Sequence, residues 1–423
     1  MISHNEYDAH DNIYLHTFAP IVVDFTEWVL KEAVKAGHQR LYFLARDGFL
    51  FYETAQILVE RKKIPIELRY LKVSRYSIRS AEYSLIGDKA LDLICTGGID
   101  VSFRKLMKRG MLKDEETQLV ADEIDFTESF DAPLNYRKVR ELKNALTDSR
   151  RFKGYVEKYS ESRLENVVGY LKQQGLMDDV DYAFVDSGWI GTLHRSLINI
   201  TGKAVHGYYF GLYEYPEDID EKLYHWYYFG PKGMIRRKVL FSNCLFETIL
   251  SEPDGMTLSY SNDGEEYCAI TGESNPNRER IARRRDIQCQ YTNEYANEYP
   301  NTDCTDYGIS KQKAKKLHTD EKLLSLLMGF PIPCEVQLLG NDLFCDDVLE
   351  SQMCPVATDL SEEDIQNLKF LNKLKILAGI KKADIHESGW IEGSIVKNDA
   401  KVNGNIRSAH FYKYILYLRK SFR

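Results

Sequence analysis

Short apolar segments that each end in a polar turn and a helix-like stretch constrain the fold more than any other feature of this sequence. Residues 40–46 read RLYFLAR, residues 66–73 read IELRYLKV and residues 180–185 read VDYAFV. Nearly continuous apolar content is typical of parallel strands that are buried on both faces of a sheet. A strand, a tight turn and a helix form the opening half of a βαβ unit. The sequence therefore predicts an α/β fold with a Rossmann-type parallel sheet.

Polar side chains stand at the ends of these segments, namely Asp47, Ser74 and Asp186. The carboxyl ends of parallel strands meet at one edge of a sheet, and open α/β sheets bind their ligands there. We therefore expect these side chains to lie close together. The alternative at each position is structural, because an aspartate or serine before a helix also caps it and a glycine permits a tight turn.

Differences in local pattern divide the chain into regions. Residues 1–83 and 176–262 carry the strand signals and form the predicted α/β core. Residues 84–175 have few strand signals and are predicted to form a helical insertion. After this core, short polar loop segments separate stretches with helical spacing, which predicts a mostly helical accessory region over residues 263–423. Within that region, Ser361 to Asp364 is typical of a capping box at a helix start.

Charge and cysteine usage bear on the partners and the compartment of the protein. The chain has 56 basic and 64 acidic residues, a net charge of −8, so no overall positive field attracts nucleic acid. Its 8 cysteines form no C-x-x-C pair, which predicts reduced thiols rather than structural zinc. No signal-like stretch and no run of ~18 apolar residues is visible in the sequence. We therefore expect a soluble, cytoplasmic protein.

The residues that follow the strand segments are of the types that hold a phosphate group. Ser74 offers a hydroxyl, and Arg75 and Arg79 offer positive charge. A helix that begins near Gly191 and Thr192 offers free N–H groups. Helix N-termini bind anions, and arginine binds them through several hydrogen bonds. These residues form the predicted phosphate-binding site.

Asp47 and Asp186 are the predicted ligands of Mg²⁺, a hard cation that prefers oxygen atoms. His194 could act as an acid or a base, although a histidine in a helix is more often packed. Asp346 and Asp347 could bind a cation, with a solvated loop as the alternative. Further candidates adjoin these motifs: Arg46, Ser187, Trp189 and Glu247.

The segments FLARDG, SRYSIRSA, VDSGWIGT and FETILSEPDGMTLSY occur in this order along the chain. Over residues 15–350, the ordered set resembles the haloacid dehalogenase (HAD)-like proteins of bacterial surface-polysaccharide loci. The resemblance implies a HAD-like parallel sheet with a cap-like helical insertion. It also implies that Asp47 is the general acid/base, Ser74 the phosphate-binding hydroxyl and Asp186 a metal ligand.

The chain departs from the pattern of that family at its first motif. Ala45 stands where the family carries its phosphate-accepting aspartate, and a methyl group cannot attack phosphorus. If the protein is an enzyme of this kind, the phosphorus must be attacked directly by water or by an acceptor hydroxyl. The lysine of the third motif has several possible counterparts, which are Lys158, Arg163 and Lys172.

These observations predict a ligand that is a phosphate-bearing small molecule or a glycan precursor. The resemblance implies a phosphohydrolase or phosphotransferase of surface-polysaccharide biosynthesis. One alternative is a glycosyltransferase-type enzyme that uses a nucleotide-sugar or a lipid-linked phosphate. Another is a catalytically inactive scaffold that binds a partner.

Residues 404–423 contain no acidic side chain and place arginines and lysines among Phe, Tyr, Ile and Leu. A basic, aromatic helix of this kind can rest on an anionic membrane surface. Packing against its own domain is the alternative. The segment therefore predicts a peripheral membrane contact or a packed terminal helix.

Overall fold

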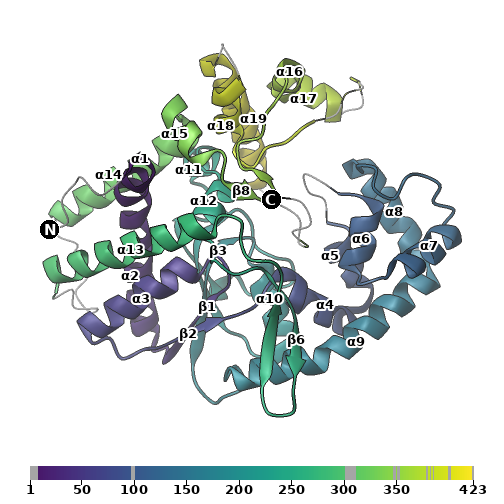
Figure 1. The fold of residues 1–423 in the computed structure, drawn as a ribbon, viewed down its shortest axis with the longest axis horizontal. Coiled ribbons are helices and arrows are strands. Elements are labelled where there is room, and N and C mark those ends of the chain that lie inside the picture. Colours follow the sequence, from purple (N-terminus) through teal and green to yellow (C-terminus); the bar gives the residue numbers. More distant parts are fainter. Residues whose placement is uncertain are drawn as a thin grey trace.

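The computed structural model describes residues 8–96, 101–300, 311–345, 349, 353–377, 380, 381, 383, 385–398 and 402–421, with only the backbone of residues 311–314. Its centre is a parallel sheet with the strand order β2-β1-β3-β4-β5 (Figure 1). The strands are β1 (Arg40–Leu44), β2 (Glu67–Leu71), β3 (Tyr182–Trp189), β4 (His206–Leu212) and β5 (Tyr224–Phe229). This Rossmann-like α/β sheet confirms the predicted class.

Helices cover both faces of the sheet. Successive residues of a strand point to opposite faces, so each strand contributes side chains to two cores. Leu41 and Phe43 of β1 belong to the core that includes α2 (Ala19–Ala36) and α3 (Phe49–Lys62). The intervening Tyr42 belongs to the core on the opposite face. That face is covered by α4 (Arg75–Ile86), α9 (Arg150–Gln173) and α10 (Thr192–Thr201). The arrangement has three layers.

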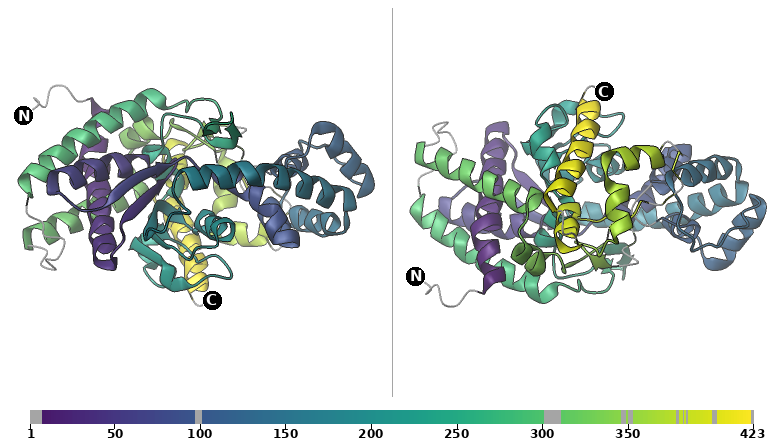
Figure 2. Two further views of the ribbon diagram at one scale, coloured as in Figure 1. Left: turned by 90° about the horizontal axis from the view of Figure 1, so that it is seen from below. Right: turned by 90° about the horizontal axis from the view of Figure 1, so that it is seen from above.

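The helices after α4 form a separate lobe at one side of the molecule (Figures 1 and 2). They are α5 (Ala90–Ile94), α6 (Phe103–Arg109), α7 (Asp114–Glu123) and α8 (Tyr136–Asp148). They have a hydrophobic cluster of their own, to which the beginning of α9 also contributes Phe152. The helix α9 then runs back from this lobe to the sheet, so the two parts share one continuous helix.

The residues after 262 begin within a hairpin and continue into the main core. The strand β6 (Thr257–Asn262) pairs with β7 (Tyr267–Thr271) in antiparallel fashion. The helix α13 (Arg278–Glu298) packs on α3, and Gln288 accepts a hydrogen bond from the Tyr14 hydroxyl at 2.8 Å. The first helix of this region is therefore part of the layer that covers the sheet.

The remaining elements lie mostly above the carboxyl ends of the strands in Figure 1. They are α1 (Ala9–Ile13), the π-helix Tyr14–Phe18, the 3₁₀ helices Gly87–Lys89 and Glu221–Leu223, α11 (Ile235–Val239), α12 (Asn243–Leu250), α14 (Lys311–Gly329), α15 (Pro333–Leu339), β8 (Leu343–Phe344), β9 (Cys354–Pro355), α16 (Glu362–Leu368), α17 (Phe370–Leu377), α18 (Ile391–Asn398) and α19 (Val402–Ser421). Ser361 caps α16, since its hydroxyl accepts a hydrogen bond from the Asp364 N–H at 3.1 Å, which confirms the predicted capping box.

Within the described part of the chain, no single helix has the length and apolar character needed to cross a membrane. A bent pair, Lys315–Gly329 with Pro333–Leu339, meets the same criteria jointly, and its two helices are inclined by 85°.

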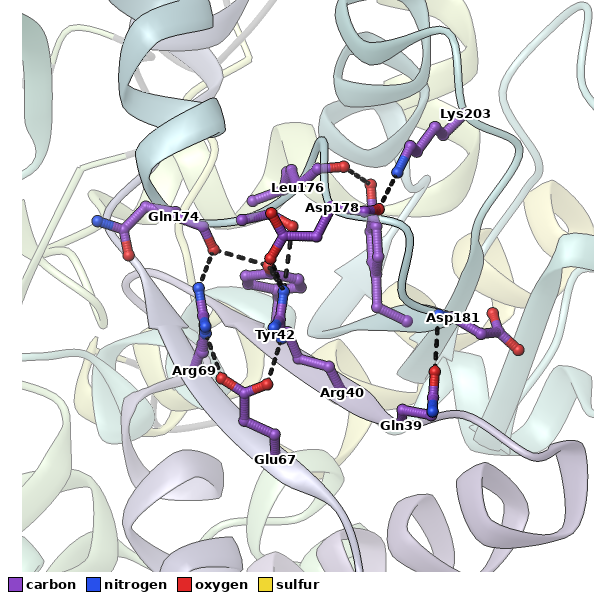
Figure 3. A network of polar contacts seen from close by, with 12 residues as sticks. Gln39, Arg40, Tyr42, Glu67, Arg69, Gln174, Leu176, Asp178, Asp181 and Lys203 are labelled. Carbon is purple, nitrogen blue, oxygen red and sulfur yellow. Dashed lines mark hydrogen bonds and ion pairs between the residues drawn. The ribbon is translucent and has the colours of Figure 1, made fainter.

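A polar network closes the amino-terminal edge of the sheet (Figure 3). The Arg40 guanidinium donates to Glu67 at 2.6 Å and to Asp178 at 2.9 Å. The Tyr42 hydroxyl donates to the Gln174 carbonyl at 2.7 Å. These contacts join the loop before β3 to the starts of β1 and β2, and so hold the register of the strands.

A group of histidines at the same edge makes stability depend on pH. The rings of His206 and His225 are joined by a hydrogen bond of 2.7 Å, and His38 lies 5.2 Å from His206 between ring centroids. Burial, together with the charges of His206 and His38, lowers the pKa of His225 to about 4. The nearby Asp181 carboxylate opposes the lowering of the His206 pKa, to which burial contributes most.

We expect the wild-type protein to lose stability as the pH falls below ~6.5. Below that pH the histidines of the unfolded chain are protonated, whereas those of the folded chain bind protons more weakly. The loss continues down to the folded-state pKa. In His225→Gln, the change in unfolding free energy between about pH 7 and about pH 5 should be smaller by about 1 kcal/mol. Urea denaturation at the two pH values measures it. An identical pH dependence in both proteins would contradict this assignment.

Candidate functional site

A pocket of about 550 Å³ opens beside the carboxyl ends of β1 and β3. In the order β2-β1-β3-β4-β5 the chain reverses direction across the sheet between these two strands, and open sheets bind ligands at such switch points. Most of the predicted site residues line the pocket: Arg46, Asp47, Ser74, Arg75, Arg79, Asp186, Trp189, Gly191, Thr192 and Glu247, together with Ala45. The structure therefore brings the three strand ends together.

Two carboxylates lie at the base of the pocket, and one serine joins them. The Ser187 hydroxyl donates to Asp47 Oδ2 at 2.7 Å, and the Ser187 N–H donates to Asp186 Oδ1 at 2.9 Å. Burial raises the pKa of Asp47, against the lowering effect of Arg46, Ser187 and Arg75. Burial and the neighbouring Asp47 charge raise the pKa of Asp186 well above its usual range. The pair therefore favours a proton or a cation.

A third carboxylate comes from α12. Glu247 accepts a hydrogen bond from the Trp189 indole at 2.5 Å, and its charge adds to the rise in the pKa of Asp186. The Trp189 ring packs against aromatic rings, with Phe241 at 5.1 Å between centroids. The tryptophan thus positions Glu247 against the pocket and forms part of the apolar wall.

Positive charge lies on the α4 side of the pocket. Arg79 is only 6% exposed, yet it forms no ion pair with a described carboxylate, and its Nε has no hydrogen-bond partner in the described residues. One Nη donates to the hydroxyl of Thr192. Burial and the nearby Arg75 lower the pKa of Arg79 to about 10. A buried cation without an ion pair is costly, which makes Arg79 a candidate for binding an anion.

The Ser74 hydroxyl has a different role from the one predicted. It accepts a hydrogen bond from the Ser77 N–H at 2.9 Å and donates to the Thr257 carbonyl at 2.6 Å. Its proton is therefore engaged by the main chain, and the residue caps α4. The Ser77 N–H is therefore occupied, and the N–H groups of Arg75 and Tyr76 at the start of α4 are the ones left without a partner in the helix.

Gly191 sets the start of α10 beside the pocket. Its φ of +74° lies in the left-handed region, and a Cβ there would come within 2.6 Å of the Tyr224 ring. Only glycine avoids both problems. The turn places Thr192 at the first position of α10, where its hydroxyl meets Arg79.

His194 does not line the pocket, and its contacts favour the packed alternative over the candidate acid or base. It is 1% exposed and hydrogen bonded through both ring nitrogens, to the Tyr209 hydroxyl at 2.7 Å and to the Val205 carbonyl at 2.8 Å. Burial lowers its pKa to about 3, so the ring stays neutral and packed.

The candidates for the third-motif lysine also lie outside the pocket. Lys158 and Lys172 are exposed. Arg163 donates to Ser80 at 2.9 Å and lies 5.1 Å above the Tyr76 ring. None of them lines the pocket. The cations that do line it, besides the predicted arginines, are Arg109 and Lys420.

Pocket residues from distant segments were missed by the sequence analysis. Arg109 of α6 donates to the carbonyls of Ile94 and Thr96, at 3.1 and 2.6 Å. On the opposite side, Tyr417 of α19 stacks on Tyr213 with 5.2 Å between centroids. Lys420 of α19 forms an ion pair of 3.3 Å with Glu214. The basic character of residues 404–423 was the only sequence signal for this wall.

The described residues contain no group of three or more His, Cys, Asp or Glu side chains arranged to hold a metal ion. Asp47 and Asp186 nevertheless fit Mg²⁺, which is often bound through one or two carboxylates and the phosphates of a substrate. Their mutual repulsion, visible in the raised pKa of Asp186, would be relieved by a cation. Asp346 and Asp347 lie outside the described residues.

The fold and the pocket together define a Rossmann-like α/β protein with a pocket at the switch point of its sheet. Neither a known protein-family model nor a curated protein matches the chain.

Proposed function

We propose that the protein binds a phosphate-bearing ligand in this pocket and acts on it as a phosphohydrolase or phosphotransferase. The observation that carries the proposal is the buried, unpaired Arg79 opposite the carboxylates Asp47 and Asp186. A phosphate would neutralise Arg79 and Arg75 and accept hydrogen bonds from the first turns of α4 and α10. The order of the segments, which resembles HAD-like proteins, supports the same ligand class.

Asp47 and Asp186 are the residues that would hold Mg²⁺. When bound, the ion would supply charge neutralisation at the phosphoryl oxygens. Glu247 and Trp189 would close the carboxylate side, since the indole fixes the Glu247 side chain. The pocket thus contains both the carboxylates that would hold a metal ion and the arginines that would bind a phosphate group.

Ala45 dictates the form of the reaction. With no aspartate at position 45, no aspartyl-phosphate forms, and the phosphorus is attacked by a water molecule or an acceptor hydroxyl. Asp47, whose pKa is raised, would take the proton of that nucleophile as its oxygen bonds to phosphorus. The bond from phosphorus to the leaving oxygen breaks, and that oxygen takes up the proton. A role in bacterial surface-glycan assembly rests on the resemblance alone.

The purified full chain should melt at a higher temperature when Mg²⁺ and a phosphate compound are both present than with either alone. Thermal shift with inorganic phosphate, uridine diphosphate and an aryl phosphate tests this, and phosphate release from the aryl ester tests hydrolysis. Stabilisation by the nucleotide without hydrolysis would favour a glycosyltransferase-type enzyme. No stabilisation by any Mg²⁺ and phosphate combination would contradict the proposal and favour an inactive scaffold.

A further inference from the structure

The outer face of α19 is apolar and exposed, although its inner face is already packed. On the inner face, Ile406 and Ala409 are buried in a cluster with Ile395 of α18. On the outer face, Phe411 is 50% and Ile415 40% exposed. A helix of a globular protein usually pairs one apolar face with a polar one. This helix therefore presents a second apolar face that the described residues leave exposed.

The exposed residues of α19 recur at helical spacing, so they share one side of the helix. Arg407, Phe411, Tyr414, Ile415 and Arg419 follow the pattern i, i+4, i+7, i+8 and i+12, and all are exposed. Tyr414 is 45% exposed. The pattern puts apolar and aromatic side chains in the middle of the face and an arginine near each end.

The neighbouring helix α17 extends this surface. Leu371, Leu374 and Leu377 are 67%, 43% and 60% exposed and follow one another at intervals of three residues. Phe370 of α17 touches Phe411 of α19, with ring centroids 4.8 Å apart. Figure 2, in its right-hand view, shows α17 and α19 side by side on one face. We call these six exposed residues, Leu371, Leu374, Leu377, Phe411, Tyr414 and Ile415, the α17–α19 face.

The two helices that form the α17–α19 face carry only basic charged residues. Neither helix contains an acidic residue. Lys369, Lys375, Arg407 and Arg419 form no ion pair with any described carboxylate. The nearest acidic run, Glu362 to Asp364, belongs to the first turn of α16, where it complements the helix dipole. Four cations without an ion pair to a described carboxylate thus lie on or next to the helices that carry the exposed apolar residues.

We propose that the α17–α19 face docks the protein on an anionic membrane surface. Exposed apolar patches with a polar rim mark interaction sites, and aromatic side chains favour the membrane interface. The unpaired lysines and arginines would meet anionic headgroups, each contributing on the order of 1 kcal/mol. A second copy of this chain fits less well, because a two-fold contact would place the same cations against each other.

The docking proposal does not depend on what the pocket binds, but it places the pocket beside the membrane. Leu416 is 36% exposed and also lines the pocket, as do Tyr417 and Lys420 on the same helix. The helix that contacts the headgroups would therefore also form one wall of the pocket.

Sedimentation of the full chain with vesicles tests the docking. It should bind phosphatidylcholine vesicles that contain phosphatidylglycerol, bind pure phosphatidylcholine weakly, and be released by salt. Phe411→Ser combined with Ile415→Ser should weaken binding at least ~10-fold. Arg407→Glu combined with Arg419→Glu should weaken it about 5-fold or more for each charge. The charge variant tests the proposal even if the serine variant folds poorly.

A matched control uses exposed apolar residues on the separate lobe. Leu119→Ser with Tyr136→Ser changes residues that are 41% and 78% exposed and should bind vesicles like the wild type. Circular dichroism checks that each variant is folded. No binding of the folded wild type to anionic vesicles would overturn the proposal. So would a dimer in light scattering that the Phe411 and Ile415 changes dissolve, since that result would assign the face to a second copy of the chain.

Discussion

Arg79→Met is expected to weaken binding of the phosphate-bearing ligand about 100-fold, while the fold stays as stable as the wild type or becomes more stable. The loss of affinity follows because the Arg79 guanidinium is buried, lines the pocket and forms no ion pair with a described carboxylate. One Nη is oriented by the Thr192 hydroxyl, and its Nε has no partner among the described residues. Those features make it available to an anion.

The free energy of unfolding of Arg79→Met should not fall, because burying a charge that has no ion pair is costly. Arg79 is 6% exposed, and burial and Arg75 lower its pKa to about 10, so the folded protein disfavours its charge. Methionine has a similar length and no charge, and replacing poorly compensated buried charges by apolar groups is neutral or stabilising by about 1 kcal/mol or more. Urea denaturation measures the stability, and thermal shift with Mg²⁺ and phosphate compounds measures the binding.

Arg109→Met is the matched control, because Arg109 is also buried and also lines the pocket. Its guanidinium donates to the carbonyls of Ile94 and Thr96, which close the end of α5. Removing it leaves those carbonyls without a donor, so this variant should lose about 1 to 3 kcal/mol of stability. If Arg79→Met lost as much stability as Arg109→Met, Arg79 would be a structural residue and the anion site would lose its main support.

The sequence predicted the sheet edge because that part of the site depends on local patterns. An apolar strand that ends in a charged turn places its last residues at the carboxyl edge, whatever the rest of the chain does. Asp47 and Asp186 follow from this rule, and so does the helix start at Gly191 and Thr192. The positions of these residues depend only on the order of the strands. The neighbouring strands β1 and β3 are also the ones with the clearest apolar runs in the sequence.

The role of Ser74 could not be read from its neighbours along the chain. A serine before a helix can offer its hydroxyl to a ligand or to the backbone. In this protein the Ser74 hydroxyl donates a hydrogen bond to the carbonyl of Thr257, which belongs to a hairpin far along the sequence. His194 shows the same dependence, since Tyr209 of the adjacent strand decides that its ring is packed.

The outer walls of the pocket were missed for a related reason. Arg109 comes from the helical lobe, and Tyr417 and Lys420 come from the last helix, so both walls depend on how separate helices dock. Helix docking is set by side-chain packing over long separations, which the local spacing of one sequence does not record. The basic, aromatic composition of residues 404–423 indicated a surface role, but not that the inner face of α19 reaches the pocket.

Asp186→Asn should make the protein more stable near neutrality and remove its response to Mg²⁺. Burial, the Asp47 charge and the Glu247 charge raise the pKa of Asp186 well above its usual range. The folded state therefore holds this proton more tightly than the unfolded state, whose aspartates titrate near ~3.9. As the pH rises from there to the folded-state pKa, wild-type stability falls by about 1.4 kcal/mol for each pH unit. Asparagine does not ionise, so the free energy of unfolding of the variant does not fall in this way as the pH rises.

Chemical denaturation between about pH 4 and about pH 7 measures the difference, which should grow with pH. The amide oxygen can still accept the Ser187 N–H, so packing is preserved. Asp263→Asn is the control. Hydrogen bonds from the Glu266 and Glu265 N–H groups lower the pKa of exposed Asp263, so its charge is already formed above ~3.9 in both the folded and the unfolded chain, and the difference between this variant and the wild type should stay nearly constant over the same pH range. If Asp186→Asn were destabilising by the same amount at every pH and still responded to Mg²⁺, Asp186 would be an ordinary structural carboxylate, and the metal would have to bind elsewhere.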